Sequence, residues 1–309
     1  MQFAIMGSGA VGGYFGGRLA AAGADVTFIA RGPHLDAMRA HGLQLESPDG
    51  DALIHPVTAT DDPVGVGVVD TVLVAVKTWQ LSEAIEQMRP LVGESTAVLP
   101  LLNGVEASDQ LAESLGKGRV LNGLCRVISH IREPGVITHV GAVPTIVFGE
   151  RDSRPSSRVH AIAESLRGAG IVVDLPDDVD AAVWTKLLFV VSLGGIGAVT
   201  RAPMGVVRSM PETRNLLEKS MQEIRGVAAG RGVNLPADIV TTALSFIGGL
   251  PPEGLTSLQR DIADGRRSEL EALTGVVVRL GREAGVETPI NDFVYGSLLP
   301  QEREAQAKD

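Results

Sequence analysis

The sequence predicts an α/β domain built on a doubly wound parallel sheet, followed by an all-α domain. Short apolar runs rich in β-branched residues alternate with helical patterns in the first half of the chain; these runs are 3–7, 25–30, 71–76 and 96–102. Near-continuous apolar strands separated by helices are typical of a parallel sheet covered on both faces. Near residue 177 the strand patterns stop and only helical patterns follow. We therefore expect one domain at 1–176 and a second at 177–309.

Each remaining element follows from a local pattern. The stretches "AVGGYFGGRLAAAG" and "LSEAIEQMRPLVG" predict the helices between the strands, and 43–57 predicts a small hairpin with its turn at Pro48-Asp49-Gly50. The second domain is expected to contain helices at 178–193, 211–230, 236–247, 257–263, 267–284 and 289–299. Pro211, Pro236 and Pro289 fall near helix starts, where proline is tolerated.

The composition excludes several classes of protein. A net charge of −10 over 309 residues argues against a nucleic-acid binder, which normally carries a basic face. Cys125 is the single cysteine, so an internal disulfide and a cysteine-based zinc site are excluded. The six histidines show no ligand spacing, and we expect no metal.

No stretch of the sequence predicts a membrane span or a secretion signal. The longest apolar run, 187–199, is shorter than the roughly 20 residues that a spanning helix needs. Strand-like residues begin at Gln2, without a basic leader. We therefore expect a cytoplasmic protein that binds neither membranes nor nucleic acid. A homodimer is compatible with the apolar surface of the helical domain, and the oligomeric state stays open.

A glycine motif follows the first predicted strand. The pattern G-x-G-x-x-G is matched by Gly7, Ser8, Gly9, Ala10, Val11 and Gly12. In a Rossmann-type domain such glycines permit a tight turn, close approach of a pyrophosphate, and close packing of helix on strand. The N-terminus of the next helix offers unpaired N–H groups to phosphate. The motif predicts a dinucleotide site; a glycine-rich turn without a ligand is the alternative.

Arg31 follows the second predicted strand, where dinucleotide-binding domains distinguish NAD from NADP. An acidic residue here binds the ribose 2′-hydroxyl of NAD, whereas an arginine favours the 2′-phosphate of NADP. No acidic residue stands at 28–32. Arg31 therefore predicts NADP(H), and a simple surface arginine is the alternative.

Two polar residues end apolar strands of the predicted sheet. Lys77 follows "TVLVAV", and Asn103 follows "VLPLL" with Gly104 next. Ligands of open α/β sheets bind outside the carboxyl ends of the strands. Lys77 and Asn103 are therefore candidates for contacts to cofactor or substrate, although either could cap a helix or turn, since Asn-Gly is a turn dipeptide.

Lys186 is a single charge within the apolar run "DAAVWTKLLFVVSLGGIGAV", residues 180–199. Lysine is rarely buried without a partner. Its ammonium could reach solvent from a packed stem. Alternatively, it could lie in a cleft and donate a proton to the alkoxide that forms when hydride reaches a carbonyl. The pattern alone leaves both readings open.

The chain resembles the ketopantoate reductase (2-dehydropantoate 2-reductase) family over nearly its whole length. The stretches that carry the resemblance are "GSGAVGG", "VKTWQ", "LPLLNGVE", "PGVITHVG", "VWTKLL" and "TSLQRDIADGRRSELEAL". It implies a Rossmann domain, a helical domain like the C-terminal domain of 6-phosphogluconate dehydrogenase, and a site in the cleft between them. It also implies NADPH-dependent reduction of ketopantoate to pantoate, a step of pantothenate biosynthesis.

The resemblance also implies roles for individual residues. Lys186 corresponds to the catalytic proton donor, Lys77 to a cofactor contact, and Asn103 to a contact of cofactor and substrate. Ser257 corresponds to a substrate-binding serine, and Glu269 to a carboxylate that contacts the cofactor or orients the catalytic site. Without the resemblance, Ser257 would be interpreted as a helix N-cap and Glu269 as part of a solvated helix face. His139 lies in a family-like stretch without a chemical role.

The substrate side departs from the family pattern. Members that reduce ketopantoate commonly carry asparagines after the lysine, as K-x-x-x-N-x-x-x-N, with another just before a glycine. Here the corresponding residues are Val190, Gly194 and Met204. A site without these amide donors favours a different, less polar 2-oxo acid. A dinucleotide-binding sensor without catalysis is a third hypothesis, and the retention of Lys186 and Glu269 counts against it.

Overall fold

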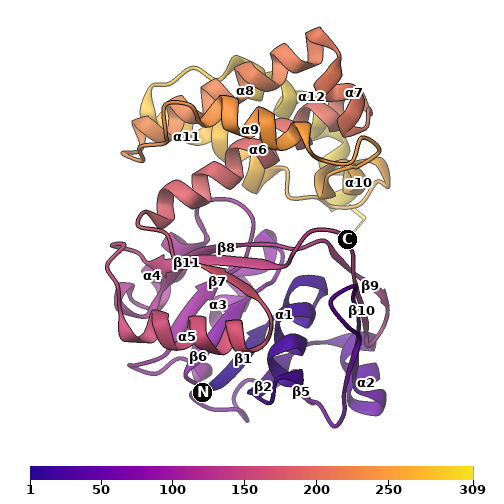
Figure 1. Cartoon of the computed structure of the whole chain (residues 1–309), viewed down its shortest axis with the longest axis vertical. Helices are drawn as coiled ribbons and strands as arrows, with labels where there is room; N and C mark the ends of the chain where they lie inside the picture. Colours follow the sequence, from indigo (N-terminus) through magenta and orange to yellow (C-terminus); the bar gives the residue numbers. More distant parts are fainter. Residues whose placement is uncertain (309) are drawn as a thin grey trace. The chain divides into compact units, whose positions relative to one another are not determined.

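The computed structural model describes residues Met1–Lys308 and divides into two compact units. Unit 1 comprises Met1–Leu102 and Glu106–Asp180, and unit 2 comprises Asn103–Val105 and the chain from Ala181 onward. Strands lie in unit 1, and the helices α6–α12 lie in unit 2 (Figure 1). The sequence predicts a division after residue 176, and it does not predict that Asn103 belongs with the helices. This assignment of Asn103 places it beside the predicted catalytic residues of unit 2.

A five-stranded parallel sheet forms the centre of unit 1, with the strand order β5-β2-β1-β6-β7. Its strands are β1 (Gln2–Met6), β2 (Asp25–Ile29), β5 (Thr58–Thr60), β6 (Thr71–Val74) and β7 (Ala97–Pro100). The four strands predicted from apolar runs are therefore confirmed. β5 was not predicted, because a run of three residues is too short to show a pattern.

Both faces of this sheet are buried, as the continuous apolar strands predict. Along β1, Phe3 and Ile5 belong to one apolar cluster, whereas Ala4 and Met6 belong to the cluster on the other face. The first cluster includes residues of α1 (Ala10–Ala21) and α5 (Ser157–Gly168). The second includes residues of α3 (Leu81–Met88) and α4 (Ala107–Leu115). Helices on both faces give the doubly wound architecture.

Two smaller sheets complete unit 1. Residues of the predicted hairpin form β3 (Leu43–Glu46) and β4 (Ala52–Ile54), which pair antiparallel as expected. Strands that the sequence did not indicate are β8 (Leu121–Arg126), β9 (Ser129–Glu133), β10 (Val136–His139), β11 (Thr145–Glu150) and β12 (Val172–Asp174). They form sheets of order β4-β3-β10-β9 and β12-β11-β8. The other elements of the unit are α2 (Gly32–His41) and the 3₁₀ turns η1 (Thr78–Gln80), η2 (Arg89–Leu91) and η3 (Lys117–Arg119).

Within its described residues, unit 2 contains helices and no strands. Its elements are α6 (Val179–Thr200), whose first two residues belong to unit 1, α7 (Met204–Ser209), α8 (Pro211–Gly230), α9 (Ile239–Gly248), α10 (Ser257–Ala263), η4 (Glu271–Gly275), α11 (Val276–Ala284) and α12 (Pro289–Gln306). The helix predicted at 178–193 is longer than expected. It continues through three glycines, although glycine lowers helix propensity by about 1 kcal/mol relative to alanine.

The glycines of α6 allow other segments to approach closely. A Cβ atom added to Gly194 would lie 3.3 Å from Thr256 Oγ1, and one added to Gly195 would lie 2.7 Å from Val294 Cγ1. One added to Gly197 would collide with the Gln259 side chain. Tertiary packing against α10 and α12 therefore outweighs the low helix propensity of these glycines.

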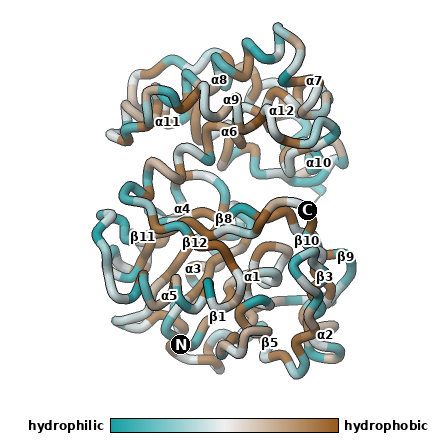
Figure 2. The backbone as a smooth tube through the Cα atoms, in the orientation of Figure 1, coloured by the Kyte–Doolittle hydropathy of each residue, from teal (hydrophilic) through white to brown (hydrophobic). Residues whose placement is uncertain are grey.

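By length and composition alone, α6 could cross a membrane; its apolar residues are coloured in Figure 2. The expectation of no spanning segment considered only 187–199, which is a part of this helix. In the structure 67% of its most apolar window is buried. Length and composition alone are weak support for a membrane span, because the core helix of a folded domain passes the same test.

The helix predicted at 267–284 is wrong at its start. Residues 266–268 are not helical, and the chain turns at Glu269 and Leu270 before η4, a single π-helical turn, and α11. The N–H and hydroxyl of Ser268 both donate to Glu302, so the N–H is not available for a helical hydrogen bond there. Glu269 consequently lies in a bend, and not on a helix.

Candidate active site

A chain of hydrogen bonds in unit 2 joins three residues that the sequence predicts for the site. Lys186 Nζ on α6 donates to Asn103 Oδ1 over 2.9 Å. The Asn103 side-chain amide Nδ2 donates in turn to Glu269 Oε2 over 2.8 Å. The Asn103 amide is therefore fixed with its oxygen toward the ammonium and its nitrogen toward the carboxylate.

The backbone around Asn103 explains how it reaches the other two residues. Gly104 has φ +88°, and a Cβ added there would lie 2.9 Å from the carbonyl oxygen of Ala272 in η4. Only glycine adopts such a backbone without strain and permits this approach. The glycine of the Asn-Gly pair thus allows the segment Asn103–Val105 to lie against the π-helical turn that follows Glu269.

Glu269 is almost inaccessible to solvent, with 7% of its surface exposed. Its interpretation as part of a solvated helix face is therefore wrong. A buried carboxylate is stable only with hydrogen-bond donors or cations nearby, and the Asn103 amide supplies one donor. Half-buried Lys186 points its ammonium to Asn103, so this amine is held in a defined position.

Ser257 lies close to the same face of α6. Lys186, Val190 and Gly194 follow one another at i, i+4 and i+8, so they share a face of the helix. Gly194 packs against Thr256 and Leu258, the neighbours of Ser257 in the chain. Thr256, with its hydroxyl accepting from the Gln259 N–H at 3.2 Å, is the N-cap of α10. The N-cap interpretation of Ser257 is therefore wrong by one residue.

The positions that depart from the family pattern are apolar or lack a side chain. Val190 is half-buried and packs against the core of unit 2. Gly194 is buried, and its tight contact with α10 leaves little room for a larger side chain. Met204 begins α7 and also packs against that core.

The glycine motif of unit 1 forms a tightly packed turn with one open position. Gly7 has φ +93°, and a Cβ added there would lie 2.6 Å from Val76 Cγ1. A Cβ on Gly12 would collide with the carbonyl oxygen of Gly7, whereas one on Gly9 meets nothing within 4 Å. The first and third glycines are thus needed for the turn and the packing. The second leaves the N-terminus of α1 open to a ligand.

A pocket of about 350 Å³ lies beside this motif. Its lining includes Gly7, Ser8, Gly9 and Arg31, together with residues that the sequence did not single out for the site, among them Gln80 and Glu83. Arg31 is exposed, and its Nη1 lies 3.4 Å from Glu83 Oε1. No local signal could have revealed Glu83, because the acidic residue that selects a cofactor is expected directly after the second strand.

Lys77 does not line this pocket within the described residues Met1–Lys308. Its Nζ lies 5.6 Å from the centroid of the Trp79 ring, and its backbone N–H donates to Gln80 Oε1 at the start of η1. Lys77 therefore has the local capping role that was the alternative interpretation, and a cofactor contact stays a prediction.

A histidine that the sequence left without a role, His34, also lines the pocket. Its Nδ1 accepts a hydrogen bond from the Gly135 N–H at 3.1 Å. Burial lowers the pKa of His34 below the usual value of 6.5. His34 is therefore neutral at pH 7, with its proton on Nε2.

His139 is a buried structural residue. Its Nδ1 lies 2.9 Å from the hydroxyl of Ser47, and its Nε2 lies 3.0 Å from the carbonyl oxygen of Ala142. The ring also stacks at an angle on Tyr14, with centroids 4.8 Å apart.

Among residues 1–308, no group of three or more His, Cys, Asp or Glu side chains could hold a metal ion.

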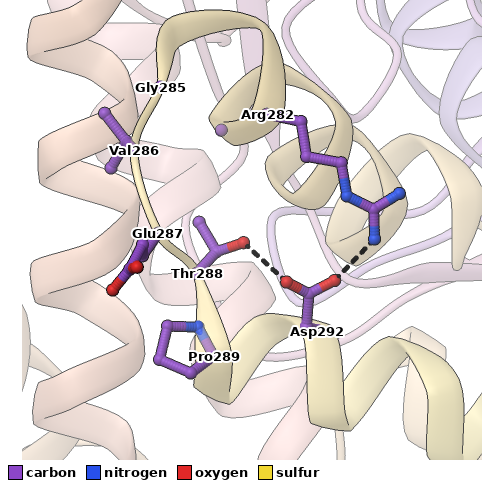
Figure 3. A pocket seen from close by; sticks show the side chains of 8 residues that line it. Arg282, Gly285, Val286, Glu287, Thr288, Pro289 and Asp292 are labelled. Carbon is purple, nitrogen blue, oxygen red and sulfur yellow. Dashed lines mark hydrogen bonds and ion pairs between the residues drawn. The ribbon is translucent and has the colours of Figure 1, made fainter.

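A separate pocket of about 570 Å³ in unit 2 lies between α11 and the start of α12. Figure 3 shows Arg282 and Thr288 both pointing to Asp292. Arg282 Nη2 lies 2.9 Å from Asp292 Oδ1, and the Thr288 hydroxyl lies 3.3 Å from Oδ2. These polar groups satisfy one another, and no predicted site residue lines this pocket.

Comparisons with known proteins identify the family of the chain. The family profile described as "Ketopantoate reductase PanE/ApbA" matches residues 3–153, and the profile of its C-terminal domain matches residues 178–302. The 2-dehydropantoate 2-reductase of Mesorhizobium japonicum is 31% identical over an alignment of 315 positions, which covers 95% of each chain. The uncharacterized oxidoreductase YkpB of Bacillus subtilis is 29% identical, over 98% of this chain and 100% of its own.

A solved structure gives the same result. The PanE/ApbA family ketopantoate reductase from Ralstonia eutropha JMP134 is 34% identical and superposes with a TM-score of 0.90, over 99% of this chain and 100% of its own. Both units are thus covered by one family, with the predicted fold confirmed. The chain belongs to the ketopantoate reductase family, whose members are oxidoreductases that use a nicotinamide dinucleotide.

Proposed function

We propose that the protein reduces 2-dehydropantoate to pantoate with NADPH, a step of pantothenate biosynthesis. The observation that carries this proposal is the hydrogen-bonded chain from Lys186 through Asn103 to Glu269. The name of the Mesorhizobium relative, 2-dehydropantoate 2-reductase, supports the choice of substrate.

Lys186 acts as the proton donor in this proposal. When bound, the dinucleotide supplies a hydride to the carbonyl carbon of a 2-oxo acid. Negative charge then develops on the carbonyl oxygen, and an ammonium is suited to stabilise that charge and deliver a proton. Asn103 holds the ammonium in position, and Glu269 orients Asn103. Ser257, near the same face of α6, is proposed to hold the substrate.

The residues of unit 1 fit a dinucleotide. Gly9 leaves open space in front of the N-terminus of α1, and Gly9 has no side chain that could cap that end. Backbone N–H groups at such a helix end bind phosphate. Arg31 in the same pocket supports NADPH, because a guanidinium is suited to a 2′-phosphate.

A second candidate substrate is a less polar 2-oxo acid. The side chain of Val190 and the absence of one at Gly194 leave the helix face beyond Lys186 without amide donors. A site without hydrogen-bond donors gains no binding energy from the hydroxyl of a substrate. Such a site would not prefer 2-dehydropantoate to 2-oxo acids that lack this hydroxyl.

A substrate panel followed by NADPH absorbance tests the proposal. We expect 2-dehydropantoate to have a kcat/KM well above that of 2-oxo acids without its hydroxyl. Faster turnover of an apolar 2-oxo acid would establish the second candidate. Binding of NADPH without turnover of any 2-oxo acid would contradict both, and would favour a sensor without catalysis.

A further inference from the structure

The pocket beside the glycine motif contains a carboxylate opposite its arginine. Glu83 lies in the first turn of α3, and Arg31 precedes α2. Glu83 Oε1 lies 3.4 Å from Arg31 Nη1, and both residues line the pocket. The arginine that is suited to a 2′-phosphate therefore already has an anionic partner supplied by the chain.

The position of Glu83 is held by its own helix. Gln87, one turn later in α3, donates from Nε2 to Glu83 Oε1 over 3.0 Å. The same carboxylate oxygen thus accepts from Gln87 and lies next to Arg31. Gln87 also lines the pocket, so the side of the pocket formed by α3 keeps Glu83 turned toward the guanidinium.

Apart from Arg31, no described ionisable side chain that lines the pocket neutralises the negative charge of Glu83. Asp61 lines the pocket, but its carboxylate pairs with Arg39 at 3.1 Å. His34 is neutral at pH 7, because burial lowers its pKa. Arg31 is thus the cation of this pocket wall that a phosphate would use, and Glu83 is the anion nearest to it.

The pair of Arg31 and Glu83 can be displaced. Their side chains are 68% and 57% exposed, and ion pairs at this exposure are weak. A phosphate monoester carries a charge of about −1.5 to −2 at pH 7, so it can replace the carboxylate on Arg31. The displaced Glu83 then stays close to that phosphate, and the two like charges repel each other.

We propose that Glu83 is a specificity-determining residue that weakens NADPH binding relative to NADH by competing with the 2′-phosphate for Arg31. The inference rests on the proposed function, because it requires a dinucleotide in this pocket. NADH lacks the 2′-phosphate and carries a neutral ribose hydroxyl, which a carboxylate tolerates as a hydrogen-bond donor. The chain would therefore discriminate less strongly against NADH than Arg31 alone predicts.

The test measures the Kd of NADPH and of NADH by fluorescence for the wild type, Glu83→Gln and Glu86→Gln. Glu86 is a matched control, because it lies on the same helix, pairs with Arg89 at 2.8 Å, and does not line the pocket. Each change removes one negative charge. We expect Glu83→Gln to tighten NADPH binding about five- to tenfold and to leave NADH within about twofold. Glu86→Gln should change neither by more than about twofold.

Two further measurements separate competition of Glu83 for Arg31 from a general effect of the Glu83 charge on the bound phosphate. The gain from Glu83→Gln should shrink below about twofold in an Arg31→Ala background, and should also decline as salt is raised. An unchanged ratio of the two Kd values in Glu83→Gln, or an equal change in Glu86→Gln, would overturn the inference. So would a gain that persists without Arg31. A wild-type protein that bound neither dinucleotide would instead overturn the proposed function, and the inference with it.

Discussion

Glu302, in α12, accepts two hydrogen bonds from Ser268, the residue directly before Glu269. The Ser268 N–H lies 3.0 Å from Glu302 Oε2, and the Ser268 hydroxyl lies 2.5 Å from the same oxygen. Glu302 is 1% exposed, so these donors replace water around a buried carboxylate. The bend that carries Glu269 is therefore anchored from α12.

Replacing Glu302 with alanine should destabilise the protein and disturb the site. The change leaves the buried N–H and hydroxyl of Ser268 without their acceptor, which costs about 2–4 kcal/mol in the free energy of unfolding. Glu304→Ala is the control, because Glu304 is exposed on the same helix and pairs with Lys308. Urea denaturation should show a change within about 0.5 kcal/mol for the control. Equal effects of the two substitutions would contradict the anchoring role.

Lys186→Ala should reduce kcat about 100-fold or more, because positioned proton donors contribute about 10²–10⁴-fold. NADPH affinity should change little, since the ammonium acts mainly at the transition state. Lys219→Ala, which removes an exposed lysine of α8, is the matched control. Retention of kcat within about threefold would show that Lys186 is a packed core residue without a catalytic role.

Asn103→Asp should impair the enzyme in a pH-dependent way. The aspartate matches the shape of asparagine, but it replaces the donor to Glu269 with a second carboxylate, 2.8 Å away in the present geometry. Two carboxylates at this distance share a proton, so one of them gains a raised pKa. Activity relative to the wild type should therefore recover as the pH is lowered. A loss of the same size at every pH would contradict the proposed orientation of the Asn103 amide.

Alanine substitutions at two glycines of the motif should separate folding from ligand binding. In Gly12→Ala the new methyl group collides with the Gly7 carbonyl oxygen, so the melting temperature should fall sharply. In Gly9→Ala the methyl group meets no protein atom within 4 Å, so stability should hold while NADPH binding weakens. Unchanged NADPH affinity in Gly9→Ala would place the dinucleotide elsewhere.

The stability of the protein should fall in mild acid through His34. Burial lowers the pKa of His34 in the folded state, so below about pH 6.5 the unfolded chain takes up a proton that the folded protein resists. The free energy of unfolding therefore declines as the pH falls from about 6.5 to the lowered pKa. Urea denaturation across this range should show a smaller decline in His34→Asn. Identical pH dependence in the two proteins would contradict this assignment.

The central sheet could be predicted from sequence because its strands are buried on both faces. In β6, Thr71–Val74, every position is buried, and the last three residues are apolar. β9 could not be predicted, because its sequence SHIRE is mostly exposed and shows no apolar alternation. The full length of α6 could not be predicted either. Its glycines lower helix propensity locally, but the close packing of α10 and α12 against them is visible only in the structure.

The site was predictable in part for a similar reason. Lys186 stands out because a charge among apolar residues is visible locally. Glu269 carries no such signal, and only the family resemblance identified it. Its hydrogen bond with Asn103 joins residues 166 positions apart, a relationship that no local pattern contains. The pairing of Glu83 with Arg31 was invisible for the same reason.

The packing of α6 has a consequence for the folding of unit 2. Apolar residues lie around most of this helix, and the segments that cover its glycines, α10 and α12, come later in the chain. A fragment that ends at residue 210 therefore exposes much of this apolar helix, because the segments that cover it are missing. Fragments truncated there should aggregate or recruit chaperones.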